Sequence, residues 1–93
     1  MPKYKVLAHQ RVYKFLTKLT DKKLKHNITS HIKKLENYPV TLTEMDIKKI
    51  RGLEKTFRIR IGKHRIIFHV DTSDKIVYVT HAGTRKKAYT KLD

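Results

Sequence analysis

Three arginines lie close together in the sequence, on both sides of a Gly-Lys pair. Arg58 and Arg60 alternate with apolar residues before Gly62-Lys63, and Arg65 opens the apolar run that follows. If the Gly-Lys pair forms a two-residue hairpin loop, Arg60 lies directly opposite Arg65. Because side chains alternate between the two faces of a strand, Arg58 shares their face. The sequence therefore predicts three guanidinium groups on one face of a β-sheet.

Such a cluster is suited to binding phosphate. Like charges that face each other across a strand pair are destabilising, and neither strand contains a carboxylate that would offset them. The nearest acidic residues, Glu54 and Asp71, lie beyond the expected strand ends. Arginine's planar fork donates two hydrogen bonds to a phosphate, whereas lysine is a hydrated point charge. The alternative interpretation is a basic sheet face with no ligand.

The C-terminal segment adds further candidates. His81, Arg85, Lys86 and Tyr89 follow the last expected strand, at 76–79. The cations would supply positive charge for an anionic ligand such as a nucleic acid, and the tyrosine ring would stack on a base. Packing of Tyr89 within the protein explains its position equally well.

The histidines predict no metal site. His64 and His69 are five residues apart on one expected strand, hence on opposite faces, and no carboxylate accompanies them. We therefore expect neither a metal nor another cofactor. His64 and His81 are candidates for proton transfer, but a polar histidine at a strand end is the simpler interpretation of each.

The composition indicates an anionic partner. The 93 residues include 23 Lys and Arg against 8 Asp and Glu, a net charge of +15, and no cysteine. A charge this high repels itself in the folded state, and nucleic acid is the first partner that would relieve it. No apolar run is long enough to span a membrane, and the first residues do not resemble a signal peptide. We expect one domain over residues 1–93, located in the cytoplasm.

The periodicity predicts the elements that position the arginines. A short edge strand at 3–8 precedes two amphipathic helices, the second capped by Thr20 or Asp21 and ended by Pro39. From residue 47 the period changes to two, which indicates a short strand at 48–51 and then strands at 57–61, 65–70 and 76–79. The predicted class is α+β: an N-terminal strand, a helical hairpin, then an antiparallel sheet with the helices packed on one face.

Together these residues resemble the RelE/ParE toxin superfamily, RelE in particular. The resemblance covers nearly the whole chain and rests on Lys-x-Ile-Arg-Gly-Leu at 48–53, the hairpin at 57–68 that contains Arg65-Ile-Ile-Phe, and, less specifically, Gly83-Thr84-Arg85. It implies a toxin of a type II toxin–antitoxin pair that cuts messenger RNA in the ribosomal A site. The implied partners are the ribosome with its mRNA and an acidic, RelB-like antitoxin that wraps the toxin in a higher-order hetero-oligomer. No membrane is implied.

The resemblance also implies roles for single residues. Arg60, Arg65, Arg85 and Tyr89 fall on catalytic positions, and Arg58 on a basic position of the same hairpin. In this interpretation a 2′-hydroxyl attacks the phosphorus, Arg60 and Arg65 hold the phosphate, Arg85 stabilises the leaving group and Tyr89 orients a base. The residues that we expect to bind RNA around them are Arg58, Lys63, His81 and Lys86.

Two departures from the family pattern bear on this mechanism. Family members often have lysine where Arg58 and Arg60 stand, and arginine is a poor general base. Tyr89 follows Arg85 by four residues, a closer spacing than in some relatives. The general base therefore stays unassigned.

Two other functions fit the same sequence. ParE-like relatives share the scaffold and inhibit DNA gyrase without cutting RNA. A basic protein that binds RNA or the ribosome without catalysis would also have this composition. Retention of all four arginines, Arg58, Arg60, Arg65 and Arg85, favours RNA cleavage over gyrase inhibition. Binding without catalysis would leave the message uncut, and Arg65→Ala would then lower affinity only.

Overall fold

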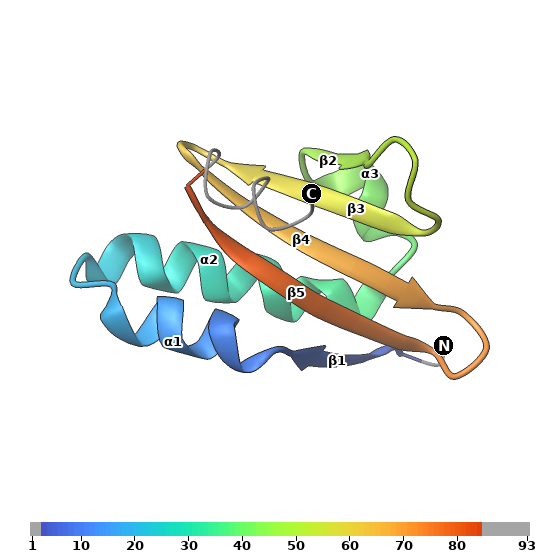
Figure 1. Cartoon of the computed structure of the whole chain (residues 1–93), viewed down its shortest axis with the longest axis horizontal. Coiled ribbons are helices and arrows are strands. Elements are labelled where there is room, and N and C mark those ends of the chain that lie inside the picture. Colours follow the sequence, from blue (N-terminus) through green and yellow to red (C-terminus); the bar gives the residue numbers. More distant parts are fainter. Residues whose placement is uncertain (1–2, 85–93) are drawn as a thin grey trace.

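One five-stranded sheet forms the centre of the computed structural model, which describes residues 3–84 (Figure 1). The strands are ordered β1-β5-β4-β3-β2, with β1 parallel to β5 and every other pair antiparallel. Their bounds are β1 Lys5–Ala8, β2 Ile47–Lys49, β3 Thr56–Ile61, β4 His64–Asp71 and β5 Ile76–Thr84.

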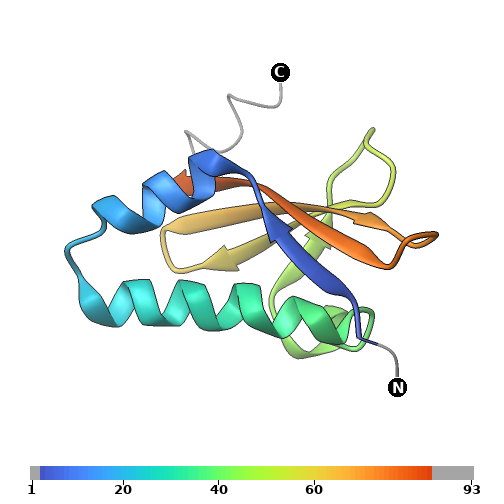
Figure 2. The ribbon, with the colours of Figure 1, turned by 90° about the horizontal axis from the view of Figure 1, so that it is seen from below.

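The two long helices run side by side along the sheet (Figures 1 and 2). They are α1 (Gln10–Lys18) and α2 (Lys22–Lys34), and the chain continues through a 3-10 turn, η1 (Leu35–Asn37), and a short α3 (Thr41–Glu44). Asp21 caps α2 by accepting a hydrogen bond from the Leu24 amide over 3.1 Å, as the sequence predicts.

The helices cover one face of the sheet only. Their buried residues Val12, Ile28 and Leu35 belong to one cluster with strand residues such as Ile59 and Phe68. This packing satisfies the apolar stripes of both helices and the inward face of the sheet. The predicted α+β arrangement is confirmed.

The central hairpin has the predicted register. Arg60 lies opposite Arg65, and Phe57 opposite Phe68, with their rings stacked 5.3 Å apart. Gly62 opens the loop with φ of +59°, a conformation that only glycine adopts freely. Of the two loop residues only this first one has a positive φ, which is typical of a type II′ turn.

Two strand boundaries differ from the predictions and change the site. β2 spans Ile47–Lys49 and begins one residue earlier than expected. β5 continues to Thr84, five residues past the expected end at Val79, because a β-bulge at Thr80 interrupts the side-chain alternation while the pairing with β4 continues. His81 therefore lies inside a strand and not in a tail.

No helix among the described residues 3–84 is long and apolar enough to cross a membrane.

A candidate phosphate-binding face

Basic side chains gather on the sheet face that the helices leave uncovered. Strand register places Lys48, Arg58, Ile67 and His81 in one row across four strands, and Arg60 opposite Arg65 in the next row. We call the five basic residues Lys48, Arg58, Arg60, Arg65 and His81 the arginine face. Ile67, at its centre, is fully buried.

Two guanidinium groups of this face have buried nitrogens without a hydrogen-bond partner. Arg65 is only 5% exposed, and its Nε atom is unpaired; Nη1 of the half-buried Arg58 is also unpaired. Within residues 3–84 only one other buried side-chain polar atom lacks a partner, the Thr41 hydroxyl. Arginine is rarely buried without a partner, because an unpaired buried donor costs about 1–3 kcal/mol, and more when it is charged. An anion bound beside these groups would supply the missing hydrogen-bond partner.

The third guanidinium group is paired. Nε of Arg60 donates to Oδ2 of Asp46 over 2.8 Å, and both side chains are about half exposed. This hydrogen bond lowers the pKa of the Asp46 carboxyl below its ordinary value, and the positive charges of Arg58 and Lys48 act in the same direction. The bond uses Nε alone, so the terminal amino groups of Arg60 stay available.

The expectation that no carboxylate would neutralise the hairpin arginines is therefore wrong for Arg60. The reason is the position of β2: with Ile47 opposite Ile59, Asp46 comes directly opposite Arg60. The two residues also share a backbone hydrogen bond, from the Arg60 amide to the Asp46 carbonyl, of 3.0 Å. Arg58 and Arg65 have no such acidic neighbour among the ion pairs that the structure describes.

His81 is held by a residue that the sequence did not single out. Nη1 of Arg11, in α1, lies 2.7 Å from Nε2 of His81, and Nδ1 of His81 lies 3.0 Å from the Thr80 hydroxyl. Arginine cannot accept a hydrogen bond, so Nε2 is the acceptor and the ring proton belongs on Nδ1. Both ring nitrogens are thus occupied, which suits a positioning role better than proton transfer.

The other predicted site residues fall into two groups. Lys63 is exposed in the hairpin loop next to the Arg60–Arg65 pair. Arg85, Lys86 and Tyr89 lie outside the described residues, and their roles stay predictions.

Histidine placement follows the predicted alternation. His64 faces the helices, with its ring 5.9 Å from that of Phe15, whereas His69 lies on the opposite face beside Thr56. Among residues 3–84 no three His, Asp or Glu side chains are grouped as a metal site would require.

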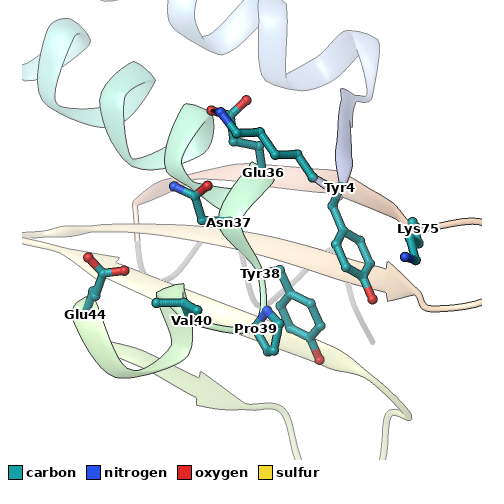
Figure 3. A pocket seen from close by; sticks show the side chains of 9 residues that line it. Tyr4, Glu36, Asn37, Tyr38, Pro39, Val40, Glu44 and Lys75 are labelled. Atoms are coloured by element: carbon teal, nitrogen blue, oxygen red, sulfur yellow. Dashed lines mark hydrogen bonds and ion pairs between the residues drawn. The ribbon is translucent and has the colours of Figure 1, made fainter. Parts of the chain in front are cut away.

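A hollow on the other side of the sheet is a weaker candidate for a phosphate site (Figure 3). It has a volume of about 540 Å³ and lies between η1, α3 and the starts of β1 and β5. Tyr4 and Tyr38 meet edge to face in it, 5.2 Å apart, and burial, helped by Tyr4, raises the pKa of the Tyr38 hydroxyl. We call it the Glu36 hollow. Two carboxylates, Glu36 and Glu44, line it with two lysines, Lys3 and Lys75, and Lys3 pairs with Glu36 over 3.4 Å, so the lining has no net positive charge for a phosphate.

Comparisons with known proteins agree with this fold. Residues 6–89 match the model of a family described as the ParE toxin of the type II toxin–antitoxin system parDE. A relative from Methanocaldococcus jannaschii named RelE1 is 33% identical over 87 residues, which are 94% of this chain and 96% of that protein.

Solved structures give the same result. The archaeal RelE–RelB complex from Pyrococcus horikoshii OT3 contains a chain that matches with a TM-score of 0.77 and 28% identity, over 92% of this chain and 99% of that one. A free RelE from E. coli shares the fold alone, with a TM-score of 0.74 and 16% identity over 97% and 92% of the two chains. The sheet, the helical hairpin and these matches define a toxin of the RelE/ParE superfamily of type II toxin–antitoxin systems. Within that superfamily the chain belongs to the RelE family.

Proposed function

We propose that this toxin is an endoribonuclease that cuts messenger RNA in the ribosomal A site and binds the scissile phosphate on its arginine face. The observation that carries the proposal is the pair of buried, unpaired nitrogens on Arg58 and Arg65. Within residues 3–84 these charged donors have no protein partner, which is costly unless a ligand uses them. A phosphodiester offers two non-bridging oxygens, enough to pair both groups.

The proposed reaction uses the nucleophile that RNA contains. The 2′-hydroxyl attacks the adjacent phosphorus, the bond from phosphorus to the 5′-oxygen breaks, and the products are a 2′,3′-cyclic phosphate and a 5′-hydroxyl. Arg58 and Arg65 donate to the non-bridging oxygens and stabilise the charge of the five-coordinate transition state. Arg60 contributes its terminal amino groups while Asp46 holds its Nε.

Two proton transfers accompany this attack, one from the 2′-hydroxyl and one to the leaving oxygen. We assign neither to His81, because Arg11 and Thr80 occupy its ring nitrogens. Arg85 and Tyr89 keep the roles that the family resemblance implies, at the leaving group and at a base. Holding the strand in line for attack is the main contribution that the described residues make.

The proposal includes partners. The relative in the Pyrococcus horikoshii structure is in complex with RelB, and a net charge of +15 suits an acidic antitoxin that neutralises the arginine face. The same charge suits ribosomal RNA, and action on the ribosome implies a cytoplasmic location. The antitoxin complex is proposed to be a higher-order hetero-oligomer.

Gyrase inhibition is the second candidate, because the matching family model is described as a ParE toxin. DNA also presents phosphates to the arginine face, but it lacks the 2′-hydroxyl that the proposed reaction needs. A supercoiling assay with purified gyrase tests this candidate directly.

Primer extension on a translated reporter mRNA tests the proposed function. We expect breaks within translated codons when the wild-type toxin is expressed, and none in a reporter without a start codon. Arg65→Ala should remove the breaks, whereas Arg51→Ala, an exposed arginine in the turn after β2, should leave them. Intact message with folded, antitoxin-free wild type would reject the proposal.

A further inference from the structure

A second hollow lies on the same side of the sheet as the arginine face, where β1 ends and α1 begins. Its volume is about 580 Å³, and we call it the Tyr78 hollow. Tyr13 is 60% exposed and Tyr78 37% exposed, so both rings are accessible to a ligand. Its lining consists of Leu7, Ala8, His9, Tyr13, His69, Tyr78, Val79 and Thr80.

Direct contacts join this hollow to the arginine face. Thr80 lines the hollow, and its hydroxyl lies 3.0 Å from Nδ1 of His81. Arg11 contacts both sides: its Nε lies 3.0 Å from Nδ1 of His9, in the hollow, and its Nη1 lies 2.7 Å from Nε2 of His81. The two sites are therefore joined by contacting side chains across the β-bulge of β5.

The spacing suits successive parts of one RNA strand. Arg65 and His69 both point to the uncovered face of β4 and are four residues apart, about 13 Å at the rise of an extended strand. Tyr78 lies directly opposite His69 on β5. A strand whose phosphate is bound at Arg65 can thus continue along β4 to the hollow.

The chemistry of the lining favours a nucleobase. Tyrosine and histidine rings stack on any base. Within the described residues His69 uses only Nδ1, against the Thr56 hydroxyl, so its Nε2 is left to hydrogen-bond the edge of a base. No carboxylate lines the Tyr78 hollow, in contrast to the Glu36 hollow on the other side of the sheet. An occupant attached to a phosphate chain therefore meets no acidic repulsion in the Tyr78 hollow.

We propose that the Tyr78 hollow binds a nucleobase of the RNA strand whose phosphate the arginine face holds. This inference rests on the proposed function and adds a site for reading sequence to it. The arginine face contacts only the backbone, which is the same in every RNA. A hydrogen bond between His69 and the base edge would make the choice of cleavage position depend on the base that reaches the hollow, whereas the stacking on Tyr78 supplies affinity for any base.

Binding of two short single-stranded RNAs of equal length tests the inference, one of mixed sequence and one with abasic ribose throughout. Tyr78→Ala should weaken binding of the mixed-sequence RNA by about 5- to 100-fold, and Tyr78→Phe should restore it because the ring is kept. The abasic RNA should bind wild type and Tyr78→Ala equally. Val40→Ala, an exposed apolar residue in the Glu36 hollow, is the matched control and should change neither.

The outcomes separate the hollow from the proposed function, because binding is measured without cleavage. If binding depends on the bases but mRNA stays intact, the proposed nuclease activity is rejected and base binding by the Tyr78 hollow is supported. Equal binding of the mixed-sequence RNA by wild type and Tyr78→Ala would overturn the inference. The hollow would then be a candidate site for a protein chain. In cells, Tyr78→Ala should shift the breaks among codons, whereas Arg65→Ala removes them; an unchanged break pattern would also count against the hollow.

Discussion

Arg60 and Asp46 form an ion pair of 2.8 Å across the β2–β3 edge of the sheet, fourteen residues apart in the chain. It is the one ion pair on the arginine face that the structure describes, and it lies at the edge, not at the centre. Asp46 therefore competes with a bound phosphate for the hydrogen bonds of Arg60, and not for those of Arg58 or Arg65. Arg58 and Arg65 are left to the ligand.

Removing this competition should strengthen RNA binding. We expect Asp46→Asn to lower the dissociation constant for single-stranded RNA roughly two- to fivefold, the size of effect that an exposed ion pair has. Fluorescence anisotropy at fixed salt measures the change. In an Arg60→Ala background the same substitution should change little, because the competing pair is already gone. An equal gain in both backgrounds would show that Asp46 acts through general charge.

The same pair predicts a pH dependence of stability. The pKa of the Asp46 carboxyl is lowered in the folded state, mainly by the hydrogen bond from Arg60, so folding favours its ionised form. The stabilisation is present above the ordinary aspartate pKa and disappears as the pH falls through the lower folded value. Urea unfolding at a series of acidic pH values should show that wild type loses more stability than Asp46→Asn between neutral pH and pH of about 3. Parallel curves would contradict the lowered pKa.

Replacing Arg65 should raise the stability of the protein and abolish its activity. Arg65→Met removes a buried charged donor that has no partner, so the free energy of unfolding should rise by about 1–2 kcal/mol while cleavage is lost. Urea denaturation measures the stability and primer extension the activity. Arg51→Met, at an exposed position, should change the free energy of unfolding by less than about 0.5 kcal/mol. A large loss of stability in Arg65→Met would instead assign Arg65 a structural role.

The central hairpin was predictable because its pattern is local. Alternating apolar residues and a Gly62-Lys63 loop determine the register of β3 and β4, and with it the common face of Arg58, Arg60 and Arg65. These features need no information from elsewhere in the chain. The register of the hairpin and the shared face are therefore confirmed in full.

Long-range partners were not predictable in the same way. The three-residue strand β2 has too little pattern to set its own register, so the pairing of Asp46 with Arg60 depends on tertiary packing. Arg11 and His81 are seventy residues apart, and only the docking of α1 beside β5 brings them together. The C-terminal end of β5 could not be predicted because of the bulge at Thr80. The alternation of apolar and polar residues stops at the bulge, whereas the pairing of β5 with β4 continues beyond it.

Salt dependence should separate the arginine face from the Tyr78 hollow. Each phosphate contact with single-stranded RNA contributes about 0.7 to the slope of log K against log salt concentration. Arg65→Ala and Arg58→Ala should each reduce this slope by roughly that amount, because each removes one cation from the phosphate chain. Tyr78→Ala should weaken binding at every salt concentration with the slope unchanged, since stacking releases no counterions. A slope that falls with Tyr78→Ala would show that the ring orders the cationic contacts, whereas an unchanged slope with Arg65→Ala would remove Arg65 from the phosphate site.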